Sequence, residues 1–307
     1  MQHGANIGRL SSTGAYRVQP GQRAVPEKVM RFALGLWQPS STAQRLRIEQ
    51  DVRAALKALI LSTPGWRGMS TATRPLSTRM AVDIRMSQRR RIQRSLLADT
   101  VFRRSHVPLS VWFRALGLFV TSDIQGISAR RLQKELGVGS YRTALDMVHK
   151  IRSLLAKVQP MLVPPLHEGR LEVPTIWPAM AGRAGGNLPI WIIVEAKSRL
   201  HRVRILYDGA TPGTPHPHLY WKGPGAESMP PACQAVADGL VPWLRCTHRK
   251  LPLPNTLQPY LNEYAFRHNI RMQKQRRDVL LGLIRVAIGE TLEDPFSWSS
   301  LNRARAD

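Results

Sequence analysis

Acidic residues, cysteines and long apolar runs are all scarce in this sequence. Asp and Glu number 20 against 45 Lys and Arg in 307 residues, which gives a formal net charge of +25. A field of this sign attracts polyanions and releases their counterions, so nucleic acid is the expected partner, and charge alone leaves RNA open. No segment approaches the ~20 apolar residues of a membrane helix, so we expect no membrane partner.

The scarcity of cysteine excludes two kinds of small fold. Cys233 and Cys246 can form neither a disulfide framework nor a four-cysteine zinc site. These two residues, with His216, His218 and His248, also match no zinc-ligand spacing, so loop histidines are the simpler interpretation. The first residues, MQHGANIGRL, lack the charged and then apolar run of a signal peptide, and we expect a cytoplasmic protein.

The N-terminal third is predicted to be helical in the middle and irregular on both sides. Residues 1–26 are rich in Gly, Ser and Gln, and residues 61–80 are polar and turn-forming. Between them, Glu27 to Ile60 has helical periodicity, which Pro39 divides into two helices. A basic run then follows, and it predicts either a solvated helix face or a phosphate-contacting helix. Its members are Arg85, Arg89, Arg90, Arg91 and Arg94.

Residues 109–155 contain the signature of a helix-turn-helix. A broad apolar helical face over Leu109–Phe119 ends before Gly126. Ser128 is a natural N-cap for the short helix ARRLQKEL, and Ser140 for the helix YRTALDMVHKIRSLL. Gly137 and Gly139 lie in the turn between these helices, which is the pattern of a DNA-binding helix pair.

This pattern gives each helix an expected role on DNA. The second helix offers Tyr141, Arg142, Thr143 and Asp146 in its first turns, where recognition helices contact base edges. The first helix is expected to cross the phosphate backbone. Many helical hairpins bind nothing, but the charge of the chain favours DNA binding. The candidate DNA-binding residues are Arg130, Arg131, Lys134, Tyr141, Arg142, Thr143 and Lys150.

After Pro160 the periodicity changes from helix to strand. The segments GRLEVPTIW, LPIWIIVEA and HRVRILYDG are rich in β-branched and aromatic residues and predict three strands of a meander. Residues 211–231 are dominated by Pro and Gly, and helical signals return from Gln234.

Three blocks of the chain resemble bacterial insertion-sequence transposases related to the Merlin elements. GISARRLQKELGVGSYRTALDMVHKIR is similar to the family pattern GISAxQLQRELGVxYKTAWxMLHKIR. VADGLVPWLRCTH and LQPYLNEYAFRHNIR are similar to VASLLKRWLLGTH and LQxYLDEFxFRxNRR, and residues 168–210 resemble the first three strands of the family's RNase H-like domain. Residues 1–95 carry no such match, and the family's Cys-rich zinc ribbon is missing.

The resemblance implies a metal-dependent chemistry whose ligands can be checked position by position. The family holds two divalent metals with three carboxylate or carboxamide side chains, which suit Mg²⁺. Pro174 stands where the first aspartate is expected, and Gln234 stands at the third position. The segment carrying the second ligand is absent after Asp208, and Pro242 is expected to break or kink the helix after Gln234.

Other acids provide a weaker alternative set. Glu172, Glu195 and Asp208 lie on or after the three predicted strands and could in principle rebuild a site. Acids at strand ends are usually solvated, so we expect no catalytic triad, no metal site and no cofactor.

We therefore predict an α+β chain. A basic N-terminal region with a linker spans residues 1–80, a helix-turn-helix region 81–160, a truncated RNase H-like α/β domain 161–290 and a polar tail 291–307.

The expected function is binding of double-stranded DNA at insertion-sequence ends without strand transfer. An active transposase with a rearranged Mg²⁺ site is the alternative, and a poorly folding product of a mutated reading frame is a third hypothesis. The family acts as dimers or higher assemblies on paired ends, which leaves room for a homo-oligomer.

Overall fold

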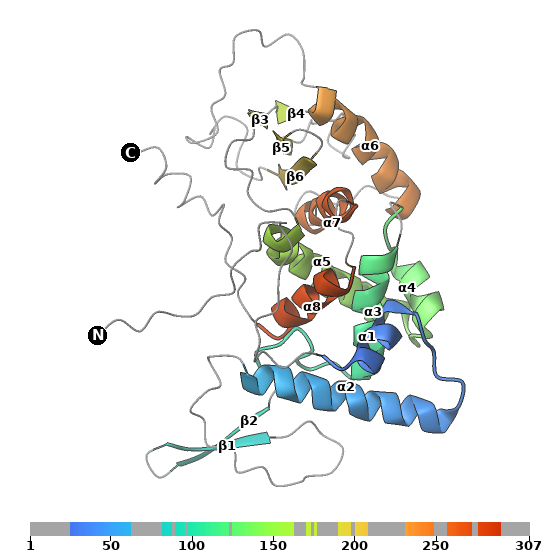
Figure 1. Cartoon of the computed structure of the whole chain (residues 1–307), viewed down its shortest axis with the longest axis vertical. Coiled ribbons are helices and arrows are strands. Elements are labelled where there is room, and N and C mark those ends of the chain that lie inside the picture. The colour runs from blue at the N-terminus through green and yellow to red at the C-terminus, as the bar shows by residue number, and fades with distance from the viewer. Residues whose placement is uncertain are drawn as a thin grey trace. The chain divides into compact units, whose positions relative to one another are not determined.

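A computed structural model describes the backbone of the chain in twelve stretches. These are residues 25–62, 82–87, 90–95, 97–122, 125–162, 170–172, 175–176, 190–197, 200–207, 231–248, 257–271 and 276–289. The described part is mostly helical (Figure 1). It falls into two compact units, divided after Thr121 and after Lys274. None of its helices is long and apolar enough to cross a membrane.

The described part of the first unit contains four helices. They are α1 (Glu27–Leu34), α2 (Thr42–Ser62), α3 (Leu109–Thr121) and α8 (Arg276–Ala287), and α3 packs against each of the other three. The expected apolar face of α3 is confirmed, since Trp112, Phe113, Leu116 and Phe119 are all buried. The expected division near Pro39 is also confirmed, because α1 ends at Gly35 in the left-handed region, with φ 79°.

Close approach and capping hold α3 in this unit. A Cβ at Gly117 would lie 1.7 Å from the carbonyl oxygen of Ala33, so only glycine allows α1 to come this near. The Glu49 carboxylate on α2 accepts hydrogen bonds from the backbone N–H groups of Leu109 and Ser110, at 3.2 and 2.8 Å. It thereby satisfies two donors at the first turn of α3.

The prediction of a helix in the basic run is wrong. Residues Val82–Ser87 and Arg90–Ser95 form strands β1 and β2, which pair antiparallel and bring Arg85 opposite Ile92 and Arg94 opposite Asp83. VDIRM alternates apolar and polar residues with the period of a strand, and the two strands are separated by two residues, which is the commonest spacing in a β-hairpin. Arg89 lies outside the described residues.

The second unit contains a helix pair, a small sheet and two further helices in its described part. The helix pair is α4 (Ala129–Leu136) and α5 (Tyr141–Leu162), which pack together. Helix α7 (Leu257–Ile270) packs against both α5 and strand β6 and lies between them (Figure 1). Helix α6 (Pro231–His248) packs against strand β5.

The three expected strands are confirmed as an antiparallel meander. Strand β5 (Ile190–Lys197) pairs with β6 (Leu200–Tyr207) on one edge, and on the other with β3 (Arg170–Glu172) and β4 (Thr175–Ile176). Both short strands follow a single register along β5. Pro174 itself, with Asp208 and the Pro-rich segment 211–230, lies outside the described residues.

Helix α6 corrects the expectation of a break at Pro242. The helix continues through Pro242 to His248, although proline removes one helical hydrogen bond at a cost of about 3 kcal/mol. Val236, Leu240, Trp243 and Leu244 are buried on either side of it, and this packing keeps the helix in place.

Candidate nucleic-acid interface

The turn between α4 and α5 has the capping geometry that the sequence predicts. The Ser128 hydroxyl accepts a hydrogen bond from the N–H of Arg131 at 3.2 Å, and the Ser140 hydroxyl from the N–H of Thr143 at 3.0 Å. Gly137 ends α4 in the left-handed region, with φ 64°. Ser128 starts the first helix, and Gly137 and Ser140 stop it and start the next within four residues, as a helix-turn-helix requires.

Packing beneath this turn is apolar. Leu132 of α4 is buried with Ala144, Val148 and Ile151 of α5, while Leu136 is half-buried. The periodicity of the two helices predicts an inner face made of these residues and Leu145. Four of the six are buried, whereas Leu136 and Leu145 are half-buried and lie nearer the surface than predicted.

The outer surface of the pair carries most of the candidate DNA-binding residues. Arg130, Lys134 and Arg142 are exposed, and the Tyr141 ring is 49% exposed, so the start of α5 faces solvent. Thr143 and Lys150 are half-buried, and the Thr143 hydroxyl lies 3.1 Å from that of Ser140. Thr143 is therefore a capping residue as well as a candidate contact.

Two arginine–carboxylate pairs distinguish the helices. On α4, Arg131 donates Nε–H to Glu135 at 2.7 Å and Nη1–H to the Gly126 carbonyl at 3.4 Å. On α5, Arg142 Nε lies 3.3 Å from Asp146 Oδ1, with most of both side chains in solvent. Arg131 fastens α4 to the loop before it through its bond to Gly126, whereas the Arg142–Asp146 pair lies on the surface of α5.

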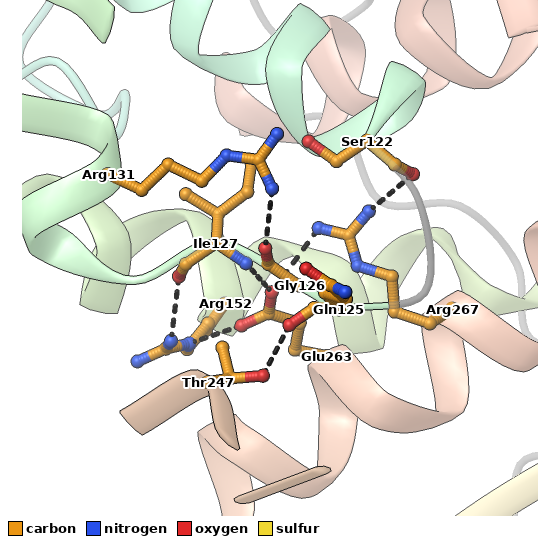
Figure 2. Close-up of polar contacts among 9 residues, drawn as sticks. All are labelled: Ser122, Gln125, Gly126, Ile127, Arg131, Arg152, Thr247, Glu263 and Arg267. Atoms are coloured by element: carbon orange, nitrogen blue, oxygen red, sulfur yellow. Dashed lines mark hydrogen bonds and ion pairs between the residues drawn. The ribbon is translucent and has the colours of Figure 1, made fainter. Parts of the chain in front are cut away.

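A buried ion network lies directly behind the first helix (Figure 2). Glu263 of α7, 0% exposed, accepts hydrogen bonds from Arg152 Nε of α5 at 2.7 Å and from the Ile127 N–H at 2.9 Å. Arg152 Nη2 donates to the Ile127 carbonyl at 3.2 Å. One carboxylate therefore joins α7 and α5 to the segment that leads into the Ser128 cap.

Arg267 completes the network from α7. Its Nη2 lies 3.3 Å from Glu263 Oε1, and its Nη1 donates to the Ser122 carbonyl at 3.1 Å (Figure 2). Burial by itself raises the pKa of Glu263, but the charges of Arg152 and Arg267 and the hydrogen bonds outweigh burial, and the net shift is downward. The carboxylate is therefore ionised at neutral pH.

The loop before α4 leaves no room for a side chain at Gly126. Gly126 has φ 76°, and a Cβ there would lie 2.8 Å from Cζ2 of Trp243 and 2.9 Å from Glu263 Oε1. The Thr247 hydroxyl of α6 donates to the Gln125 carbonyl (Figure 2). Helices α6 and α7, together with Arg152 in the middle of α5, thus fix where the pair begins.

Aromatic rings line the opposite side of Arg152. Its guanidinium carbon lies 4.1 Å from the centroid of the Tyr260 ring, and His149 packs edge-on against the same ring. Burial first and the Arg152 charge second lower the pKa of His149. His149 is thus mostly neutral at pH 7, and the positive charge of this region comes from arginine and lysine.

Backbone register separates two of the alternative metal-ligand positions. Glu172 pairs with Val194 and Leu171 with Glu195, so Glu172 and Glu195 are one residue out of register. Successive residues of a strand belong to opposite faces of a sheet, so these two positions do not share a face. Gln234 lies in the first turns of α6. Among the residues that the structure describes, no group of three His, Cys, Asp or Glu residues is placed to hold a metal ion.

Sequence reasoning missed Glu263, Arg152 and Arg267 as important residues. All three lie in the segments HKIR and LNEYAFR, where they look like ordinary charges on amphipathic helices. The available signal is that Glu263 directly precedes two aromatic residues, Tyr264 and Phe266, and both of these are buried in the structure. Comparisons with protein-family models, curated proteins and solved structures found no match for this chain.

Proposed function

We propose that this chain binds double-stranded DNA through α4 and α5, as a transposase-related protein without strand-transfer activity. The observation that carries the proposal is the α4–α5 pair itself: both helices are capped, Glu263 fixes the segment that leads into α4 through the Ile127 N–H, and Arg130, Lys134 and Arg142 are exposed. A formal net charge of +25 supports a polyanionic partner, and DNA of insertion-sequence ends is the partner that the resemblance implies.

Residues 168–210 belong, in this proposal, to the first strands of a truncated RNase H-like domain. The antiparallel order of β3 and β4, β5 and β6 agrees with a meander. Pro174 and Gln234 in place of two metal ligands, and the register that separates Glu172 from Glu195, support loss of cleavage. The proposed site of action is the cytoplasm.

Duplex binding as a function of salt tests the proposal most directly. We expect the full chain to bind, with an affinity that falls steeply as salt increases. The double variant Arg130→Gln/Arg142→Gln should weaken binding and reduce the slope of log K against log salt by about 1 for each phosphate contact that it removes. Unchanged affinity and slope would place the interface elsewhere.

A matched variant separates local contacts from total charge. Arg45→Gln/Arg47→Gln removes the same charge from exposed positions on α2. If it weakens binding as much as the α4–α5 variant does, the effect comes from the overall field and the proposed interface is wrong.

Nicking and strand-transfer assays with Mg²⁺ or Mn²⁺ test the second half of the proposal. Binding without cleavage is the expected result. The alternative function, an active transposase, requires cleavage that Glu172→Ala or Asp208→Ala abolishes.

A further inference from the structure

The candidate interface contains one arginine whose geometry differs from that of Arg131. Arg142 is 82% exposed in its side chain, lies in the first turn of α5 and approaches the Asp146 carboxylate through Nε, which lies 3.3 Å from Oδ1. The two Nη groups are the pair of donors that a guanidinium presents side by side at its end. In Arg142 the ion pair is made at Nε, on the side of the guanidinium rather than at this end.

From this arrangement, and resting on the proposed function, we infer that Asp146 is a specificity-determining residue that holds Arg142 for reading a guanine base. Guanine presents two acceptors, N7 and O6, in the major groove, and two parallel arginine donors match them. Because Asp146 occupies Nε, the end of the fork is the part of Arg142 that remains for the duplex.

The charge of Asp146 also favours a base over a phosphate group as the DNA contact of Arg142. A carboxylate that is 54% exposed beside Arg142 repels phosphate oxygens, so it disfavours use of Arg142 as a simple phosphate contact. A residue that only strengthened nonspecific binding would be better placed without an acidic neighbour. The pair therefore gives up some affinity for any duplex and gains discrimination at one base pair.

Arg131 provides an internal comparison for this assignment. It has the same spacing to an acid, with Glu135 four residues later, but its Nη1 also donates to the Gly126 carbonyl. One member of its fork is committed to the protein backbone. Arg131 is therefore suited to positioning α4, and its substitution should affect all sequences alike.

Selection of bound duplexes from a random pool by the full-length chain tests the inference. The wild type should enrich sequences that share a G·C pair at one position. Arg142→Lys keeps the charge but loses the two-donor fork, and should reduce the preference at that position by about 5- to 150-fold. Asp146→Asn should reduce the same preference while strengthening binding to unrelated duplexes, a combination that a folding defect cannot produce.

Control variants and outcomes separate this inference from the proposed function. Arg131→Lys and Glu135→Gln should leave the selected sequence unchanged. If the wild type binds duplex but Arg142→Lys and Asp146→Asn select the same sequence as the wild type, the assignment of Asp146 is overturned and DNA binding stands. If the folded wild type binds no duplex, both are overturned.

Discussion

Helices α3 and α7 are both buried, but they are held by different forces. Helix α3, in the first unit, buries only apolar residues and glycine, with Trp112, Phe113 and Phe119 at 1% exposure or less. Helix α7, in the second unit, buries Glu263, Arg267 and Asn269 at equally low exposure. Asn269 hydrogen-bonds both the N–H and the carbonyl of Val203 on β6, at 2.8 and 2.9 Å. The core-facing side of α3 is therefore held by hydrophobic burial, whereas that of α7 also depends on matched polar partners.

This difference predicts that α7 is most sensitive to the loss of a charge and α3 to added volume. Glu263→Ala should cause the largest loss of stability. Removing the carboxylate leaves Arg152 and Arg267 buried without their shared anion, which destabilises a protein by about 3–5 kcal/mol. Urea unfolding followed by circular dichroism measures the loss.

An apolar replacement of the whole network sharpens this prediction. The triple variant Arg152→Met/Glu263→Leu/Arg267→Met carries no buried charge and should be more stable than Glu263→Ala. A triple variant less stable than the single one would mean that the bonds to the Ile127 and Ser122 carbonyls matter more than the ion pairs.

The second-largest expected effect is a loss of stability at low pH, and it again concerns a residue of α7. Burial, followed by the charge of Arg271, lowers the pKa of His268 from 6.5 to about 4. The folded chain therefore binds fewer protons than the unfolded chain in this window. Stability from this group is complete above pH 6.5 and falls as pH drops from 6.5 toward 4, by about 3 kcal/mol in all.

His268→Phe isolates that contribution. Phenylalanine can keep the edge-on contact with Tyr264, whose centroid lies 4.7 Å from that of His268, and it has no proton to gain. The variant should lose less stability than the wild type between pH 6.5 and 4. Identical pH profiles for the two proteins would show that His268 does not titrate in this range.

The contrast between the helices also explains what sequence reasoning could reach. Caps at Ser128 and Ser140 involve residues three positions apart, and the inner face of α3 is periodic, so both were predictable. The Glu263–Arg152 pair joins residues 111 positions apart, and periodicity carries no information about such a contact. The helix prediction for the basic run was wrong for a related reason. Arg residues suit a helix surface and a strand alike, and the pairing of β1 with β2 decided between them.

For α3, the third prediction is steric. Gly117→Ala would place a Cβ 1.7 Å from the Ala33 carbonyl oxygen, so α1 must move away, at a cost of about 1–3 kcal/mol. Thermal unfolding monitors this loss. Gly139→Ala is the matched control, since a Cβ there meets nothing within 4 Å. Equal stability of the two variants would mean that α1 and α3 separate at no cost in stability.

The smallest losses of stability should come from the helix caps, which depend neither on the apolar packing around α3 nor on the buried polar network of α7. Ser128→Ala and Ser140→Ala each remove a hydroxyl that accepts a backbone hydrogen bond at a helix start, worth about 1 kcal/mol. Ser153→Ala is the control, because that exposed hydroxyl only returns a hydrogen bond to the Lys150 carbonyl within α5. Alanine there should be neutral or slightly stabilising. Urea midpoints that fall for the two cap variants but not for Ser153→Ala would show that local capping stabilises the starts of both helices, whereas equal midpoints for all three would show that the two hydroxyls contribute nothing to stability.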